Sequence, residues 1–371
     1  MTENGEHAGE SLPEDEARAA FARGFESLSD DLGCINLAIL GDTGVGKSSL
    51  VNAMFGEDLA RVDVGEPVTQ GVTPYVNATE TLRLYDFPGF EFSKRRKPIE
   101  IIKADLKAIQ RGPEAERIHA AWFCWDSGSG RVQKEHQAAI AALASMRITT
   151  IGVLTKVRDD EVDQIRRFAR WIAMNVDGIH PRIMLTRAGR PPTRGLLELL
   201  EETEKVAPSF RDALEAAQRI DVKAKRRTAR GLIAAAAASA AGAAATPIPV
   251  ATAAVLAPIQ LGMMGKLAAL YGLSLKGILG SAGFLQLALQ LTGRAAAQSL
   301  ITLVPGAGSV INATIASVWT YAAGEAWLQL CEGIASGRIE PKGADAILDM
   351  LKPIMDEYLR AKFQGSASAS A

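Results

Sequence analysis

The chain has 371 residues with 41 basic and 42 acidic side chains, which leaves a net charge of −1. This length has room for two domains, and the balanced charge indicates no nucleic-acid partner. The cysteines Cys34, Cys124 and Cys331 are odd in number and scattered, which argues for a reducing compartment and against a disulfide framework or a zinc cluster.

Residues 1–33 form an acidic N-terminal segment. Residues 1–31 hold nine acidic side chains and only Arg18 and Arg23 as basic ones, and they lack the apolar core of a signal peptide. A helical pattern over residues 11–28 places five apolar side chains on one side, namely Ala17, Ala20, Phe21, Phe25 and Leu28. We expect a cytoplasmic protein with an N-terminal arm whose helix packs against the rest of the chain. The alternative is a helix that binds a partner.

From residue 34 to about residue 207, apolar runs alternate with helical patterns, which is typical of βαβ units. We expect strands at 35–40, 74–78, 81–85, 118–125, 149–154 and 181–185, and helices near 48–55, 98–110, 133–145 and 160–175. This rhythm predicts a doubly wound α/β domain that binds its ligand at the carboxyl ends of its strands.

The first expected strand ends in a glycine-rich loop of the form G-x-x-x-x-G-K-[ST], which begins at Gly41. Its glycines let successive backbone N–H groups face a phosphate, and the N-terminus of the next helix adds partial positive charge. Lys47 would reach the β- and γ-phosphates, and the Ser48 hydroxyl would bind Mg²⁺. The loop predicts a nucleoside-triphosphate site built from Asp42, Thr43, Gly44, Val45, Gly46, Lys47, Ser48 and Ser49.

A second Mg²⁺ contact is expected at Asp86-Phe87-Pro88-Gly89, a D-x-x-G motif at the end of a strand. Asp86 would hold the ion through a water molecule, and the Gly89 N–H would bond the γ-phosphate. Upstream, either Thr69 or Thr73 could close over the ion, and Thr69 is favoured because it leaves room for a two-stranded hairpin before the motif. The expected catalytic groups are Lys47, Thr69 and Gly89, and the expected metal ligands are Ser48, Thr69 and Asp86.

Phe90 follows this motif, at the position where many nucleotide-hydrolysing switch proteins carry a glutamine that orients water. A phenyl ring cannot hydrogen-bond water, so we expect slow hydrolysis unless help comes from a backbone group, a partner or a homodimer across the nucleotide face. Arg131 and the basic run at residues 94–97 are candidate sources of such help. The histidines His7, His119, His136 and His180 are spread over the chain, and a structural role is expected for each.

Base selection is expected at Thr155-Lys156-Val157-Arg158-Asp159, which follows the strand at 149–154 and approximates the pattern N/T-K-x-D. Thr155 and Lys156 fit, but the carboxylate of Asp159 comes one residue late. Asp159 could reach the base if the loop bulges, or Arg158 could replace that interaction and loosen the selectivity. We expect guanine, with adenine as the alternative. Residues 185–188 are a degenerate match to a loop that covers the base.

Residues 208–335 have a different character. Helical stretches at 196–205 and 210–220 lead into a basic cluster, which we define as Lys223, Lys225, Arg226, Arg227 and Arg230. From 231 to 324, only Lys266, Lys276 and Arg294 are charged. Helix-breaking proline and glycine residues divide this alanine-rich, all-α domain into helices near 231–245, 249–271, 276–302 and 309–331.

Two interpretations of this domain stay open. The uncharged runs 232–265 and 295–324 are long enough for helices that enter or lie in a bilayer, with the basic cluster on anionic membrane lipid. The alternative is a soluble helical bundle. Residues 336–371 are expected to form an amphipathic helix at 343–362 and a disordered, low-complexity tail.

The motifs at 41–49, 86–89 and 155–159 resemble those of the translation-factor-related GTPases of the Era and TrmE kind, over about residues 35–190. This resemblance implies GTP and Mg²⁺ as ligands and hydrolysis to GDP and phosphate; Arg158 departs from it.

The motifs Thr246-Pro247-Ile248-Pro249 and Leu303-Val304-Pro305-Gly306-Ala307-Gly308 resemble an uncharacterised helical domain related to YcjF-type bacterial inner-membrane proteins. That resemblance implies a GTPase that couples its nucleotide state to association with the cytosolic side of the membrane. The alternative function is a nucleotide-gated module whose helical domain docks a protein partner.

Overall fold

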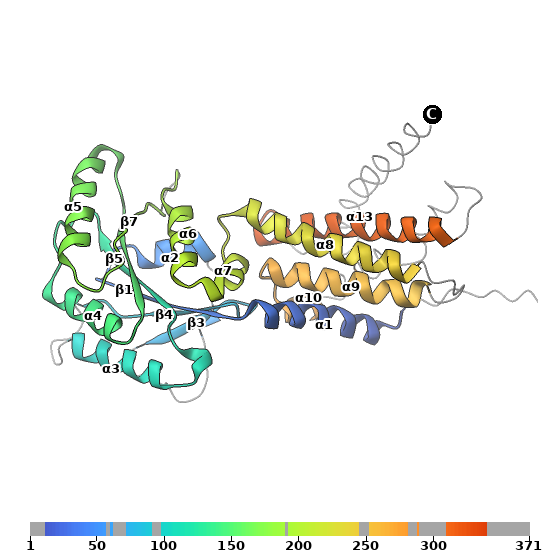
Figure 1. Ribbon diagram of the computed structural model, residues 1–371, viewed down its shortest axis with the longest axis horizontal. Helices are drawn as coiled ribbons and strands as arrows, with labels where there is room; N and C mark the ends of the chain where they lie inside the picture. The colour runs from blue at the N-terminus through green and yellow to red at the C-terminus, as the bar shows by residue number, and fades with distance from the viewer. Residues whose placement is uncertain are drawn as a thin grey trace, which may run out of the picture. The chain divides into compact units, whose positions relative to one another are not determined.

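The computed structural model describes residues 12–56, 60–61, 72–90, 98–189, 192–244, 252–280, 288 and 309–339 (Figure 1). The chain divides into two compact units. The first, Leu32–Val222, is called the sheet unit here, and the second, Met1–Asp31 with Lys223–Ala371, is called the helical unit. The boundaries expected from the sequence lie at residues 33 and 207, whereas this division lies at residues 31 and 222.

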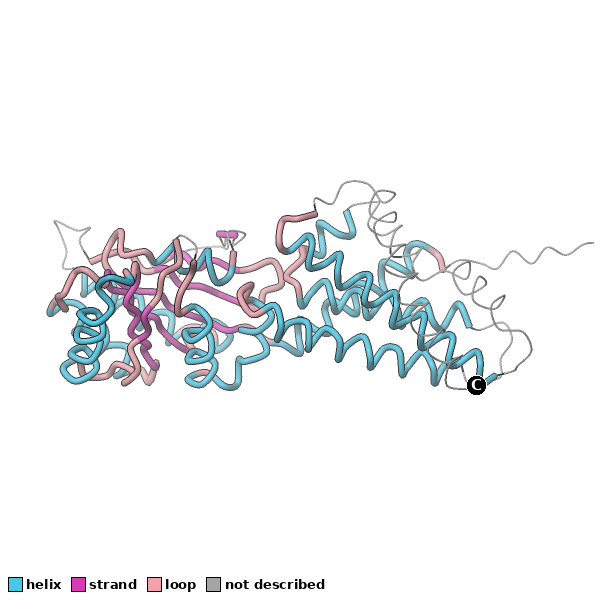
Figure 2. Tube along the Cα trace, turned by 90° about the horizontal axis from the view of Figure 1, so that it is seen from above, coloured by secondary structure: helices cyan, strands magenta, loops and turns pink. Residues whose placement is uncertain are grey.

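The sheet unit contains one mixed sheet whose strands are coloured magenta in Figure 2. The strand order is β2 (Ala60–Arg61), β3 (Thr73–Val76), β4 (Leu82–Asp86), β1 (Ile35–Gly41), β5 (Ala120–Asp126), β6 (Thr149–Thr155) and β7 (Met184–Leu185). β1 is buried along its whole length and pairs in parallel with β4 and β5, whereas β3 is antiparallel to its neighbours β2 and β4. The predicted α/β class is confirmed. The short strand β2 was not predicted.

Helices cover both faces of the sheet because each face carries its own apolar core. One core contains residues of α2 (Lys47–Phe55), α6 (Leu196–Val206) and α7 (Arg211–Ala217). The other contains residues of α3 (Pro98–Arg111), α4 (Lys134–Ser145) and α5 (Val162–Asn175). The described residues of the unit also form three short 3₁₀ helices: η1 (Glu114–Glu116), η2 (Asp159–Glu161) and η3 (Pro208–Phe210).

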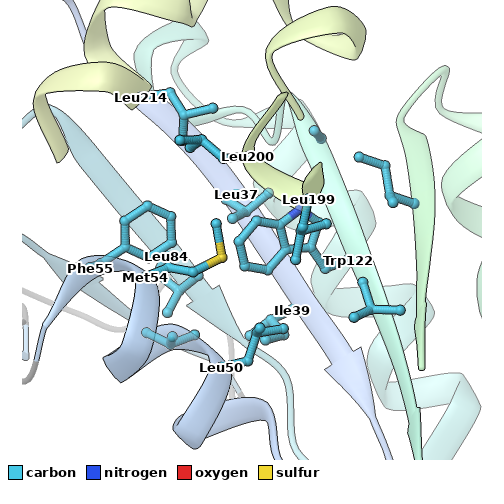
Figure 3. Close-up of a cluster of buried hydrophobic side chains, with 14 of the residues drawn as sticks. Leu37, Ile39, Leu50, Met54, Phe55, Leu84, Trp122, Leu199, Leu200 and Leu214 are labelled. Atoms are coloured by element: carbon cyan, nitrogen blue, oxygen red, sulfur yellow. The ribbon is translucent and has the colours of Figure 1, made fainter. Parts of the chain in front are cut away.

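The first core explains why the sheet unit extends past residue 207. Figure 3 shows Trp122 of β5 among Met54 and Phe55 of α2 and leucines of α6 and α7. The rings of Phe55 and Trp122 stack with centroids 5.9 Å apart, and Trp122 Nε1 donates to Thr203 Oγ1 of α6 at 3.0 Å. Burial of Leu214 against the sheet places α7 in this unit as well.

The described helices of the helical unit are α1 (Glu14–Leu32), α8 (Val222–Ala244), α9 (Thr252–Leu270), α10 (Leu275–Gly280) and α13 (Ser309–Ala335). α1 packs closely on α9: a Cβ added to Gly24 would lie 2.1 Å from the Gly262 carbonyl oxygen, and one added to Gly265 would lie 2.1 Å from that of Phe21. The five apolar side chains expected on one side of α1 are all buried. The N-terminal helix is therefore packed into this unit.

The basic cluster forms the first turns of α8, whereas the sequence placed it before the first helix of the apolar domain. Arg226 binds Glu332 of α13 with Nε–Oε1 and Nη2–Oε2 distances of 2.6 and 2.5 Å. Arg230 Nε lies 2.9 Å from Glu325 Oε1, and the buried Lys225 lies over the ring of Tyr271 at 5.5 Å. Lys223 and Arg227 are exposed. Three members of the cluster thus have partners inside the unit.

Within the described part of the chain, no helix combines the length and the apolar character needed to cross a membrane. Most of the helix expected at 276–302, the turn at 305–308 and the helix expected at 343–362 lie outside the described residues.

Candidate nucleotide-binding site

The glycine-rich loop connects the end of β1 to the start of α2, as the sequence predicts. Gly41 has a φ of 140°, and a Cβ there would lie 2.3 Å from the carbonyl oxygen of Cys124 on β5. Only glycine fits this position without moving the neighbouring backbone. Lys47 Nζ donates to the carbonyl oxygens of Gly41 at 2.8 Å and Asp42 at 3.0 Å, so its ammonium lies on the inner side of the loop.

A pocket of ≈ 380 Å³ lies between this loop and the D-x-x-G motif. It is lined by Thr43, Gly44, Gly46, Lys47, Ser48, Ser49, Asp86, Phe87, Pro88, Gly89 and Lys156. Gly89 lies against the loop so closely that a Cβ on it would be 2.3 Å from Thr43 Oγ1. The structure therefore brings together two motifs that are far apart in the sequence.

Asp86 provides the test of whether these residues suit a divalent cation. Its Oδ1 is buried and has no hydrogen-bond partner among the described residues. Burial raises the pKa of this carboxyl, and the nearby Lys47 ammonium opposes the shift. A buried carboxylate oxygen that faces a lysine and a serine hydroxyl across one pocket suits Mg²⁺, which prefers oxygen ligands.

Of the two threonines that could close over the ion, the structure describes Thr73 but not Thr69. Thr73 lies in β3, with its Cα opposite that of Asp86 in the β3–β4 register. This agrees with the expectation that Thr73 belongs to the strand. Thr69, the favoured ligand, lies outside the described residues, and its role stays a prediction.

A second pocket, of ≈ 700 Å³, adjoins the loop and is the expected base site. It is lined by Gly46, Ser49, Thr155, Lys156, Val157, Arg158, Asp159, Asp160, Arg187, Ala188 and Gly189. Thr155 Oγ1 is within hydrogen-bond distance of the carbonyl oxygens of Val45 and Trp125, so it ties the glycine-rich loop to β5. Lys156 has a φ of 54°, which is uncommon for a residue with a side chain. Its Nζ pairs with Asp126 Oδ2 at 2.8 Å.

The carboxylate of Asp159 is held by two arginines that the sequence did not assign to it. Arg187 Nη1 lies 2.7 Å from Oδ2, and Arg194 Nη1 lies 2.9 Å from Oδ1. The hydrogen bond from Arg187 lowers the pKa of this carboxyl below its ordinary value. Arg158 turns to Asp160, with Nη2–Oδ2 at 3.3 Å. Asp159 thus lines the base pocket, but both of its oxygens already have donors.

Phe90 and His136 lie next to the pocket at the glycine-rich loop, where the sequence predicts only a structural role for the histidine. Phe90 is 6% exposed, and its ring centroid lies 5.7 Å from that of Phe123 and 5.0 Å from that of His136. His136 Nε2 lies 3.0 Å from Asp42 Oδ1 in the glycine-rich loop. No local sequence pattern marks this contact, because the two residues are far apart in the chain.

Comparison with known proteins gives one family match. Residues 36–156 match the family model described as 50S ribosome-binding GTPase. The probable GTP-binding protein EngB of Roseobacter denitrificans is 27% identical over 188 residues, which are 48% of this chain and 85% of that protein.

Two solved structures are similar at low identity. Era of Aquifex aeolicus bound to GDP and aluminium fluoride has 18% identity and a TM-score of 0.34 over 59% of this chain and 69% of that chain. The G domain of the T. maritima FeoB iron transporter has 19% identity and a TM-score of 0.32 over 47% of this chain and 99% of that chain. The family match over residues 36–156 and the similarity to EngB, together with the order of strand, glycine-rich loop and helix, support a P-loop GTPase domain in the sheet unit.

Proposed function

We propose that the protein is a Mg²⁺-dependent GTP-binding protein that hydrolyses GTP slowly. The observation that carries the proposal is the buried Asp86 Oδ1, which has no hydrogen-bond partner in the described part of the chain and belongs to a residue that lines one pocket with Lys47 and Ser48. Removing a carboxylate from water is costly, so a cation or a strong donor is its natural partner. Burial already raises the pKa of Asp86, and a bound divalent ion would lower it again.

Each residue of the site has a distinct part in this proposal. Lys47 neutralises the β- and γ-phosphates, and the Gly89 N–H donates to the γ-phosphate. Ser48, Asp86 through a water molecule, and Thr69 would hold Mg²⁺, which when bound neutralises the charge that develops on the phosphates. Thr155, Lys156 and Asp159 line the base pocket, and selection of guanine over adenine is assigned to this group.

Slow hydrolysis follows from Phe90. Its ring is buried against Phe123 and His136. Because a phenyl ring has no hydrogen-bond donor or acceptor group, it cannot orient the attacking water. Rates on the lower side of the range of roughly 1–10³ s⁻¹ that is typical of enzymes are expected. A second copy meeting the nucleotide face could supply a stabilising cation, and the specific activity would then rise with protein concentration.

For the helical unit we propose that it binds a protein partner in a way that depends on the nucleotide state. Pairing of Arg226 with Glu332 and of Arg230 with Glu325 supports this choice, since these guanidinium groups are already neutralised. Association with a bacterial inner membrane is the second candidate, and the many apolar side chains of α9 and α13 favour it.

The GTPase proposal is tested with a matched pair of variants. Asp86→Asn should lower Mg²⁺-dependent GTP turnover by at least about tenfold, because it removes a charge next to the ion. Asp105→Asn is the control. Asp105 Oδ2 is also buried and without a hydrogen-bond partner among the residues that the structure describes, and burial raises the pKa of Asp105 too, but this residue lies in α3 and lines neither of the two pockets. Equal turnover by the two variants in the presence of Mg²⁺ would exclude the assigned site.

The proposal for the helical unit is tested by co-sedimentation with phosphatidylglycerol vesicles, and with phosphatidylcholine vesicles as the control. We expect no pelleting in the presence of either GDP or a GTP analogue. Pelleting that needs both the anionic lipid and the analogue would establish the membrane candidate in place of the protein partner.

A further inference from the structure

We propose that His136 is a positioning residue that couples the glycine-rich loop to Phe90, the residue that follows the γ-phosphate-sensing motif. The inference rests on the proposed GTPase function. It assigns to a histidine outside every recognised motif the task of holding two parts of the nucleotide site in register.

The hydrogen bonds of His136 define its tautomer. The imidazole is 1% exposed, and its Nδ1 accepts from Trp125 Nε1 at 3.0 Å and from the backbone N–H of Gln133 at 3.3 Å. Because Nδ1 accepts from both donors, the proton of the neutral ring is on Nε2. That N–H then donates to Asp42 Oδ1 at 3.0 Å. Every polar atom of this buried ring is satisfied in one arrangement only.

Asp42 connects this ring to the phosphate-binding lysine. Its backbone carbonyl accepts from Lys47 Nζ at 3.0 Å, while its side chain accepts from His136. The Asp42 side chain is 19% exposed, so water only partly competes for it. A shift of the loop that moves Lys47 toward or away from a phosphate must therefore also change the bond to His136.

Phe90 connects the same ring to the motif that senses the γ-phosphate. The ring centroids of Phe90 and His136 are 5.0 Å apart at an angle of 58°, within the range of favourable aromatic contacts. Phe90 directly follows Gly89, whose Cα lies against Thr43. The loop and the motif are thus joined twice, by the backbone contact of Thr43 with Gly89 and by the side-chain path Asp42–His136–Phe90.

The local anchoring of His136 makes this path stiff. His136 is the third residue of α4, and its backbone N–H and ring take part in a reciprocal capping arrangement with Gln133. The ring is also enclosed by Phe123 and Trp125 of β5, with centroids at 5.3 and 6.2 Å. A ring held on these sides transmits displacement between Asp42 and Phe90 instead of absorbing it.

The test separates the two halves of the imidazole. In His136→Gln the side-chain amide can take the place of Nε2 and donate to Asp42, whereas in His136→Asn the side-chain carbonyl takes the place of Nδ1 and accepts from Trp125 and Gln133. We expect kcat for GTP to fall about tenfold in His136→Asn, or about 1.4 kcal/mol, and to stay within about threefold of the natural protein in His136→Gln. The dissociation constant for a GTP analogue should change by less than about threefold in both.

Thermal unfolding of both variants is recorded to separate coupling from packing. Equal loss of kcat in the two variants, in proportion to lost thermal stability, would overturn the proposal and leave His136 as a structural residue. A loss of affinity as large as the loss of kcat would overturn it too. If both variants still bind the GTP analogue but lack the expected difference in kcat, the coupling proposal fails while the proposed GTPase function stands. The failure of one proposal is therefore distinguishable from the failure of the other.

A spectroscopic measurement on the full-length protein gives an independent readout. With ¹⁵N-labelled histidine, the His136 signals are identified by their disappearance in His136→Gln and should report the Nε2–H tautomer. A GTP analogue should shift these signals, whereas His119, which precedes β5 at the opposite end of the strand from Asp126, should not respond. An Nδ1–H tautomer, or signals that ignore the nucleotide, would contradict the coupling.

Discussion

Replacing Arg226 by alanine should destabilise the helical unit, whereas the same change at its neighbour Arg227 should not. The Glu332 carboxylate that Arg226 binds has a side-chain exposure of 6%. Removing the arginine leaves a buried negative charge that, among the described residues, still accepts from the Tyr271 hydroxyl at 3.0 Å. Breaking a fully buried pair in this way costs about 3–5 kcal/mol. Because the Arg226 side chain is 49% exposed and water reaches it, we expect about 2 kcal/mol.

The reciprocal change should cost less. Glu332→Gln keeps the shape of the side chain and an acceptor for Tyr271, and it leaves behind an arginine that water can solvate. We expect about 1 kcal/mol, the typical value of one hydrogen bond. The order of the two costs follows from the difference in burial between the partners, and a simple count of ion pairs would not predict it.

The assay is hydrogen–deuterium exchange of α13 backbone amides in the full-length protein, which reports opening of that helix without interference from the sheet unit. Arg227→Ala is the control, because Arg227 is exposed on the same helix, and it should change the opening free energy by less than about 0.5 kcal/mol. Equal protection in Arg226→Ala and Arg227→Ala would refute the reasoning. Loss of anionic-vesicle binding in Arg226→Ala, without loss of protection, would assign the cluster to lipid instead.

Further predictions concern the sheet unit. Lys47→Ala should abolish tight GTP binding without unfolding the domain, as measured by calorimetry alongside circular dichroism; unchanged affinity would exclude the assigned loop. Because burial raises the pKa of Asp86, protonation competes with Mg²⁺, and the affinity for Mg²⁺·GTP analogue should fall more steeply on acidification in the natural protein than in Asp86→Asn. Asp159→Asn should weaken GTP more than its xanthine counterpart in competition assays, since an amide donates where the carboxylate accepts; an unchanged ratio would remove Asp159 from base reading. Burial, together with the positive charge of Arg83, lowers the pKa of His119 to about 4, so the unfolded chain binds the extra proton first as pH falls below about 6.5. Stability to urea should therefore fall by about 1–2 kcal/mol between these values, after discounting for partial exposure, and an NMR titration of His119 near its ordinary pKa would contradict this.

Local patterns in the sequence predicted the candidate site because the residues of its glycine-rich loop are consecutive. An apolar run followed by glycines and Lys47 becomes a strand, a loop and a helix whatever surrounds it. Asp86 and Thr155 each end a strand, and the carboxyl ends of neighbouring parallel strands share one edge of the sheet. Periodicity therefore predicted both the existence of the pocket and its place in the fold.

Long-range pairing was not predictable in the same way. In the sequence alone, the basic cluster resembles a lipid-binding segment. Its partners Glu325 and Glu332 come about a hundred residues further along the chain, so the local sequence does not reveal the pairing. The N-terminal helix showed an apolar face, but the sequence did not indicate that Gly262 and Gly265 of α9 would cover it.

What the sequence by itself determined is the set of short, contiguous signals: the glycine-rich loop, the D-x-x-G motif, the alternation of strands and helices, and the change to an alanine-rich helical region. Only the tertiary structure decided that Asp159 is held by Arg187 and Arg194, that three members of the basic cluster have partners within the helical unit, and that His136 bonds to Asp42 beside Phe90. The physical reason is that a hydrogen bond or ion pair needs only a few ångströms in space and no particular separation along the chain, so it leaves no periodic trace in the sequence.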